Sequence, residues 1–134
     1  MIVLDASAVV ELLLNLPLAG QIRRRLTDPV LGVHAPQLCV VEVLQVIRRR
    51  EREHRATPQA AATAVGLLPE LDISYHEHQI LARRIWELRH NLTAYDAAYV
   101  ALAEALGAPL VTTDARMARA PGHQARIELM APAS

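Results

Sequence analysis

The sequence has no lysine and no phenylalanine, and its one cysteine is Cys39. A single cysteine cannot form a disulfide within the chain, so we expect a reducing compartment, the cytoplasm. Fourteen arginines balance fourteen acids, and this zero net charge gives no general sign of a nucleic-acid partner. Trp86 and three tyrosines are the whole Phe/Trp/Tyr content. Base stacking on an aromatic platform is therefore not an expected mode of RNA binding.

Long apolar runs and a targeting segment are also missing. The apolar runs are far shorter than the roughly 20 residues that a membrane-spanning helix needs, so we expect no membrane association. The amino terminus has no basic region followed by a small-residue cleavage site, which predicts no secretory signal. With 134 residues, 52% of them hydrophobic, the chain is expected to form a single domain over residues 1–134.

Short apolar segments alternate with helical patterns along the chain. We expect strands over residues 2–4, 30–34, 71–75, 110–113 and 127–130. We expect helices over residues 8–14, 18–27, 36–53, 58–68, 77–89 and 94–106. Ser7, Thr57 and Thr93 are expected helix caps, and Gly107 is an expected helix end. This alternation is typical of an α/β fold in which helices cover a mainly parallel sheet of four to five strands.

Four acids stand in apolar surroundings. Asp5 follows the strand IVL, and Asp114 ends PLVTT. Glu42 is the one charge in QLCVVEVLQVI, and Asp96 lies in LTAYDAAYVALAEAL on the face of Val100. In parallel α/β sheets, the carboxyl ends of the strands and the helices that follow them meet at one edge. We therefore expect the four carboxylates to converge there.

Converging carboxylates repel one another, and their pKa values rise unless a cation neutralises them. Oxygen ligands without cysteine or paired histidine suit a hard cation, Mg²⁺ or Mn²⁺. A water held between such a metal and a free carboxylate is a nucleophile, for which a phosphodiester is the natural electrophile. For each acid taken singly, a helix cap, an arginine partner or a tyrosine hydroxyl remains an alternative explanation.

Four segments carry a resemblance to a known family: IVLDASAVV, VVEV, AYDAAYVALAEALGAPL and LVTTDARM. Together they resemble the PIN-domain ribonucleases, most closely the VapC toxins of bacterial VapBC toxin–antitoxin pairs. The resemblance spans nearly the whole chain. It implies a PIN-like α/β/α sandwich and a Mg²⁺- or Mn²⁺-dependent endoribonuclease. Such a toxin hydrolyses RNA phosphodiesters and inhibits translation and growth until its antitoxin binds.

The resemblance also implies roles for particular residues. Asp5, Glu42, Asp96 and Asp114 would surround one or two metal ions. Asp5 and Asp96 would be the most direct ligands, and Glu42 would act through water or as the general base. A VapB-type antitoxin would fill the groove of a homodimer with its carboxy-terminal segment, giving a heterotetramer or a larger complex.

Three further residues are supporting candidates. Ser7 and Thr112 match positions where the family often carries a hydroxyl near the site, although each is equally well explained as a cap or a strand residue. Arg116 would meet a phosphate or an antitoxin carboxylate, or it would be solvated. The arginine runs 23–25 and 48–50 are open to two interpretations, a solvated helix face or a rim that contacts RNA or antitoxin.

Two alternatives remain beside the toxin hypothesis. The chain would be a PIN nuclease without an antitoxin, or a PIN-like module that binds RNA or protein without turnover. A phosphohydrolase of the haloacid-dehalogenase type is set aside, because it requires a second Asp where Ser7 stands and a lysine that the chain lacks. The sequence does not specify whether tRNA, rRNA or mRNA would be the substrate.

Overall fold

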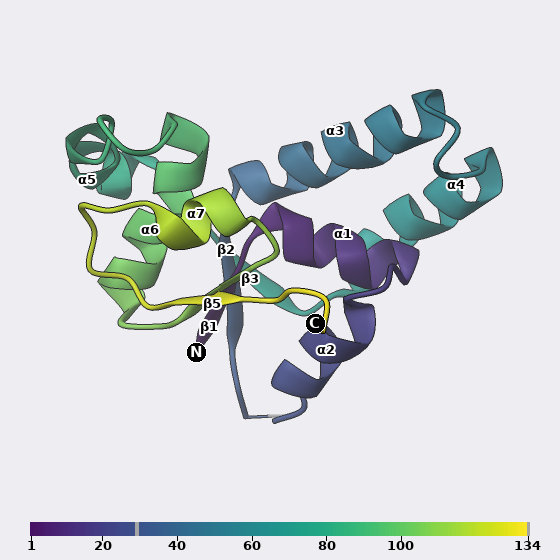
Figure 1. Ribbon diagram of the computed structural model, residues 1–134, viewed down its shortest axis with the longest axis horizontal. Helices are drawn as coiled ribbons and strands as arrows, with labels where there is room; N and C mark the ends of the chain where they lie inside the picture. The colour runs from purple at the N-terminus through teal and green to yellow at the C-terminus, as the bar shows by residue number, and fades with distance from the viewer. Residues whose placement is uncertain (29, 134) are drawn as a thin grey trace.

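The computed structural model describes residues 1–28 and 30–133, and its centre is a parallel sheet (Figure 1). The five strands are β1 (Ile2–Leu4), β2 (Val33–Pro36), β3 (Ile73–His76), β4 (Leu110–Thr112) and β5 (Ile127–Leu129). Their order is β3-β2-β1-β4-β5, and every adjacent pair is parallel. The predicted α/β class with a parallel sheet is confirmed. All three residues of β1 are buried, as expected for a central strand covered on both faces.

Helices cover the sheet on both sides. The α-helices are α1 (Ala6–Leu14), α2 (Ala19–Arg25), α3 (Leu38–Arg52), α4 (Pro58–Leu67), α5 (Ala82–Glu87), α6 (Ala94–Leu106) and α7 (Ala115–Arg119). Two 3₁₀ helices are η1 (Leu68–Glu70) and η2 (Gln79–Leu81). Figure 1 shows α5 and α6 on one side of the sheet and α1 to α4 on the other, with α3 and α4 as a projecting antiparallel pair.

Helix α6 packs against β1, β2 and β4 and carries one of the candidate acids. Its residues 97–103 are all buried, so the helix is apolar on almost every side after its first turn. Thr93 accepts a hydrogen bond from the backbone N–H of Asp96 (3.1 Å), and Gly107 ends the helix at φ 61°. The predicted cap and end of this helix are confirmed, as is the Thr57 cap of α4.

Four local predictions are wrong. The cap of α1 is Asp5, and Ser7 lies inside the helix. The second strand lies at Val33–Pro36 instead of 30–34, because pairing with β1 and β3 sets its limits. Pro36 therefore belongs to a strand, and α3 begins at Leu38, whose N–H is accepted by Nε2 of His78 (3.0 Å). The helix expected over 77–89 is shorter and divided into η2 and α5.

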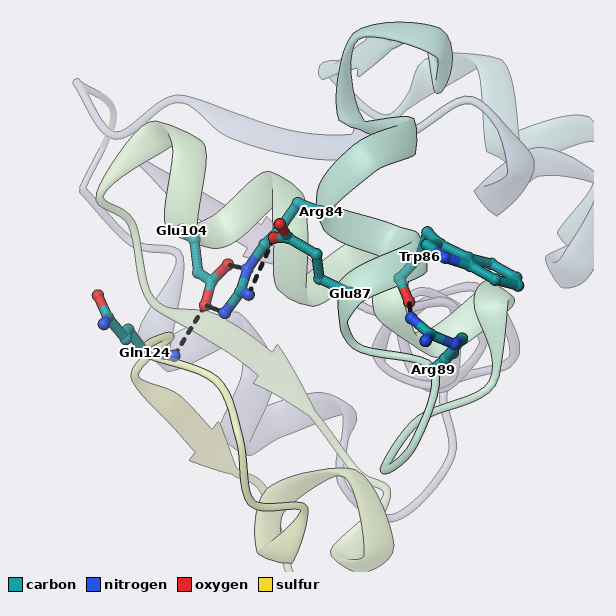
Figure 2. A network of polar contacts seen from close by, with 6 residues as sticks. All are labelled: Arg84, Trp86, Glu87, Arg89, Glu104 and Gln124. Carbon is teal, nitrogen blue, oxygen red and sulfur yellow. Dashed lines mark hydrogen bonds and ion pairs between the residues drawn. The ribbon is translucent and has the colours of Figure 1, made fainter.

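A polar network fastens α5, α6 and the segment before β5 to one another (Figure 2). Arg84 donates from Nε and Nη2 to the two carboxylate oxygens of Glu104, at 2.7 and 3.0 Å. The backbone N–H of Gln124 donates to the same carboxylate at 2.7 Å. The hydrogen bonds from Arg84 hold the pKa of Glu104 below its usual value. The network therefore anchors the distal end of the helix that carries Asp96.

Within residues 1–28 and 30–133, no helix combines the length and apolar composition needed to span a bilayer.

Candidate active site

Asp5 stands where the central strand passes into α1. Its backbone is extended (φ −72°, ψ 153°), and its carbonyl oxygen accepts the N–H groups of Ala8 (3.0 Å) and Val9 (3.2 Å). The backbone of Asp5 therefore begins the helix, while its carboxylate makes no capping hydrogen bond. Only 6% of the residue is exposed. The fold thus buries a carboxylate that it does not use to start the helix.

Two hydroxyl groups bind the same oxygen of Asp5. Thr112 and Ser7 each donate to Oδ2 over 2.7 Å. Both hydroxyl oxygens in turn accept backbone N–H groups from the end of β4: Thr113 donates to Ser7 (3.1 Å), and Asp114 donates to Thr112 (3.0 Å). These backbone donors direct the hydroxyl protons toward Asp5. In the described part of the chain, no side-chain donor binds Oδ1, so this oxygen has acceptor capacity for a further ligand.

Glu42 is held by a tyrosine that the sequence analysis did not identify. Tyr99 is fully buried, and its hydroxyl donates to Oε1 of Glu42 over 2.6 Å. The signal for Tyr99 was its position three residues after Asp96, on the same face of α6. The bond joins α3 to α6, and each of these helices carries one of the candidate acids. It leaves Oε2 of the half-buried Glu42 available to a ligand or a proton.

Asp96 and Asp114 lie nearer the rim. Asp96 is half-buried in the first turn of α6. Asp114 is the cap of α7, where its Oδ1 accepts the N–H of Arg116 (2.9 Å). The guanidinium of Arg116 lies 3.7 Å from the same oxygen, and 87% of its side chain is exposed. Arg116 is thus solvated at the edge of the group of acids, where its guanidinium is accessible to an anion.

The acids influence one another electrostatically. Burial raises the pKa of Asp5, and Asp96 raises it further, while the hydrogen bonds from Thr112 and Ser7 oppose the shift. The pKa of Glu42 is also raised by burial, and Asp5 and Asp96 add to this effect. Burial raises the pKa of Asp96, with a further contribution from Asp114. Asp5, Glu42 and Asp96 are therefore near enough to one another to interact electrostatically, and Asp114 joins this group through Asp96.

The four acids do not form a complete metal-binding site by themselves. Among residues 1–28 and 30–133, no three His, Cys, Asp or Glu side chains lie close enough together to hold a metal ion directly. The donor chemistry nevertheless fits Mg²⁺ or Mn²⁺, because every donor is an oxygen. Burial, with a smaller contribution from the neighbouring acids, raises the pKa values of Asp5, Glu42 and Asp96, and a bound cation would offset this effect. Mg²⁺ is commonly bound by one or two carboxylates and several waters, which an open group of acids accommodates.

Comparison with known proteins places the chain in a family. The PIN domain model matches residues 2–123. Ribonuclease VapC12 of Mycobacterium tuberculosis is 41% identical over 131 residues, covering 98% of this chain and all of the relative. Ribonuclease VapC1 of the same species is 40% identical over 129 residues, which is 96% of each chain. The chain belongs to the PIN-domain family and, within it, to the VapC proteins.

Solved structures share the fold. M. tuberculosis VapC20, described as a sarcin-ricin loop cleaving toxin, has a TM-score of 0.67 at 18% identity and covers 88% of this chain and 93% of its own. VapBC2 from Rickettsia felis, bound to a DNA fragment from its promoter, has a TM-score of 0.68 at 16% identity, with coverage of 96% and 98%. At these identities the comparison supports the fold, and the site rests on the residues described above.

Proposed function

We propose that this protein is a Mg²⁺- or Mn²⁺-dependent endoribonuclease and the toxin of a VapBC-type toxin–antitoxin pair. The observation that carries the proposal is the buried carboxylate of Asp5, whose Oδ2 is fixed by Thr112 and Ser7 beside the coupled acids Glu42 and Asp96. Relatives that match nearly the whole chain at 40–41% identity are named ribonucleases, which supports the same activity.

The proposed site residues are Asp5, Glu42, Asp96 and Asp114. Asp5 and Asp96 would hold the cation directly, and Asp114 would contribute from the rim. When bound, such an ion lowers the pKa of a coordinated water and polarises a phosphoryl oxygen. Hydrolysis adds water across the P–O3′ bond, so the products carry a 5′-phosphate and a 3′-hydroxyl.

The chain's own residues would orient the site carboxylates and remove a proton from the attacking water. Thr112 and Ser7 fix Oδ2 of Asp5 and so set the direction in which Oδ1 points. Tyr99 fixes Oε1 of Glu42 and leaves Oε2 to accept a proton from the attacking water. Arg116, exposed at the rim, would pair with a phosphate of the RNA or with a carboxylate of the antitoxin.

The proposed partners are an RNA substrate and a VapB-type antitoxin. The protein would form a homodimer, and the antitoxin would inhibit it by forming a heterotetramer or a larger complex with it. A solved VapBC complex with the same fold supports the antitoxin partner. The proposed biological effect is inhibition of translation and growth. The proposed compartment is the cytoplasm, in keeping with the free thiol of Cys39.

The direct test is cleavage by the purified protein, freed of antitoxin. Structured RNA should be cut in Mg²⁺ or Mn²⁺, the new ends should carry 5′-phosphates, and EDTA should stop the reaction. Cutting that continues in EDTA would refute the metal dependence. RNA that is bound but never cut, across metals and substrates, would favour the binding module. A neighbouring antitoxin gene, or its absence, decides between a toxin and a PIN nuclease that acts alone.

A further inference from the structure

The two arginine runs of this chain have different environments. In α2, Arg23 donates to Oδ1 of Asn15 (3.2 Å), and Arg25 binds both carboxylate oxygens of Glu128 (2.6 and 3.1 Å). In the described part of the chain, no carboxylate lies within ion-pair distance of the α3 run 48–50 or of Arg52, which follows it on the same helix. The α2 run is therefore partly used in holding the fold, whereas the α3 run is free to bind an anion.

The free arginines share a helix face with a site acid. Glu42, Gln45, Arg49 and Arg52 follow one another at positions i, i+3, i+7 and i+10 of α3, which places them along one side of the helix. A rise of 1.5 Å per residue puts Arg49 about 10 Å and Arg52 about 15 Å from Glu42 along the axis. The stripe therefore begins at the candidate active site and follows α3 away from it. Figure 1 shows that this helix projects from the body of the protein.

The stripe borders a groove that is open to solvent. A cavity of about 340 Å³ is lined by Gln45, Arg48, Arg49, Arg52 and Glu53. It adjoins a larger one of about 810 Å³ beside the turn into α4, where Arg48, Arg52 and Arg55 are among the lining residues. Residues 48–55 contain five arginines and two glutamates, and Glu53 already has a partner in Arg55 (3.7 Å). The groove is therefore positive.

We infer that this arginine groove binds the phosphate backbone of an unpaired RNA strand that leaves the cleavage site along α3. The inference rests on the proposed function, because Glu42 supplies the link between the groove and the chemistry. Guanidinium groups match phosphate geometry, and RNA cleaved at exposed loops offers single-stranded phosphates on either side of the cut. Phosphate contacts fix the position of the strand without reading its sequence.

The test measures binding of a fluorescein-labelled oligouridylate by fluorescence anisotropy, in EDTA and over a series of salt concentrations. The double variant R49Q/R52Q should bind about tenfold more weakly, and the slope of log K against log salt should shrink by about 1.4, or about 0.7 for each lost phosphate contact. The variant R49K/R52K keeps the charge and should keep most of the slope.

R24Q is the matched control. Arg24 is an exposed arginine in the last turn of α2, so it shares the helix-end position and the charge but not the groove. It should leave both affinity and slope unchanged. An R49Q/R52Q slope equal to that of the wild type, or an equal loss in R24Q, would overturn the inference. Loss of antitoxin binding with an unchanged RNA slope would also overturn it, because the groove would then belong to a protein partner.

Because binding is measured without cleavage, the two proposals fail separately. A wild-type protein that binds the oligonucleotide through the groove but never cuts RNA would refute the proposed function alone. A wild-type protein that cuts RNA while R49Q/R52Q keeps its salt slope would refute the groove alone. Thermal unfolding of each variant confirms that these exposed substitutions leave the fold intact.

Discussion

The hydroxyl of Thr112 donates a hydrogen bond of 2.7 Å to Oδ2 of Asp5, a residue 107 positions earlier in the chain. The contact exists because β1 and β4 are neighbours in the sheet, with Leu4 paired to Val111. The residues that follow this pair, Asp5 and Thr112, therefore lie side by side at the carboxyl edge of the sheet. Thr112 is fully buried, and its hydroxyl oxygen accepts the N–H of Asp114. The strand end therefore supplies a donor whose direction is fixed by the backbone.

Replacing Thr112 with valine keeps the shape of the side chain and removes this donor. We expect the free energy of unfolding to fall by about 1–2 kcal/mol, because a buried carboxylate loses one of its two side-chain hydrogen bonds. RNA cleavage should fall about 10- to 100-fold, as is usual when a group that orients a metal ligand is lost. Urea unfolding and initial cleavage rates measure the two effects. Thr112→Ser retains the donor, and inactivity of that variant would contradict this explanation.

Neutral substitutions of the site acids should abolish RNA cleavage without lowering the stability of the fold. Asp96→Asn keeps the size of a half-buried side chain and removes one of the charges that raise the pKa of Asp5 and Glu42. We expect no measurable RNA cleavage and a melting temperature at least equal to that of the wild type. Asp5→Ala should likewise abolish cleavage.

The control for these acids is Asp72→Asn, at an exposed acid outside the group. It should cleave RNA as the wild type does. Full activity in either Asp96→Asn or Asp5→Ala would refute the site assignment.

Tyr99→Phe tests whether the phenol holds Glu42 in place. The ring still fills the core, so the unfolding free energy should fall by only about 0.5–1.5 kcal/mol for the lost hydrogen bond. Cleavage should fall more steeply, through kcat, because Oε1 of Glu42 loses its donor. Tyr75→Phe, at a half-buried tyrosine on β3, is the matched control. An equal loss of rate in both variants would mean that Tyr99 contributes packing alone.

The network in Figure 2 predicts a stability difference that depends on pH. Arg84 holds the pKa of Glu104 below its ordinary value of 4.5, so the ionised carboxylate stabilises the fold at pH values above that value. Glu104→Gln should unfold about 1–3 kcal/mol more easily near neutral pH. This gap should shrink as the pH falls through the lowered pKa of the folded state, because the wild-type carboxylate then takes up a proton.

Urea unfolding of both proteins over the acid range checks this dependence. Glu87→Gln removes a more exposed and longer contact to the same arginine (3.3 Å) and should cost less. A gap between Glu104→Gln and the wild type that stays constant with pH would show that the charge of Glu104 is not responsible.

Cys39 should be unreactive in the folded protein. Its thiol is fully buried in α3, and burial raises its pKa to about 12. Because the thiolate is the reactive form, a chromogenic disulfide reagent should label the native protein only as fast as local unfolding exposes the thiol. In urea the same thiol should react at once. Rapid labelling of the native protein near neutral pH would contradict the described burial.

The amino-acid sequence by itself predicts the features that depend on neighbours along the chain. The Thr93 cap and the Gly107 end of α6 follow from backbone groups within one turn. The alternation of apolar strands and helices predicted the parallel sheet, whose carboxyl edge receives Asp5 and Asp114 whatever their local roles. The PIN family was recognisable from the same segments that carry the acids.

The tertiary structure alone decides which groups meet across the sheet. Ser7 looked like a helix cap, yet its hydroxyl binds the carboxylate of Asp5, the residue that does cap α1. The position of Tyr99 one turn after Asp96 was too weak a signal to identify it, because the role of its hydroxyl depends on Glu42, 57 positions away. The two arginine runs have the same sequence, and only the fold gives the α2 run polar partners that the α3 run lacks among the described residues. Local patterns set where elements form, whereas strand order and helix packing set the distances between side chains, and a site is made of those distances.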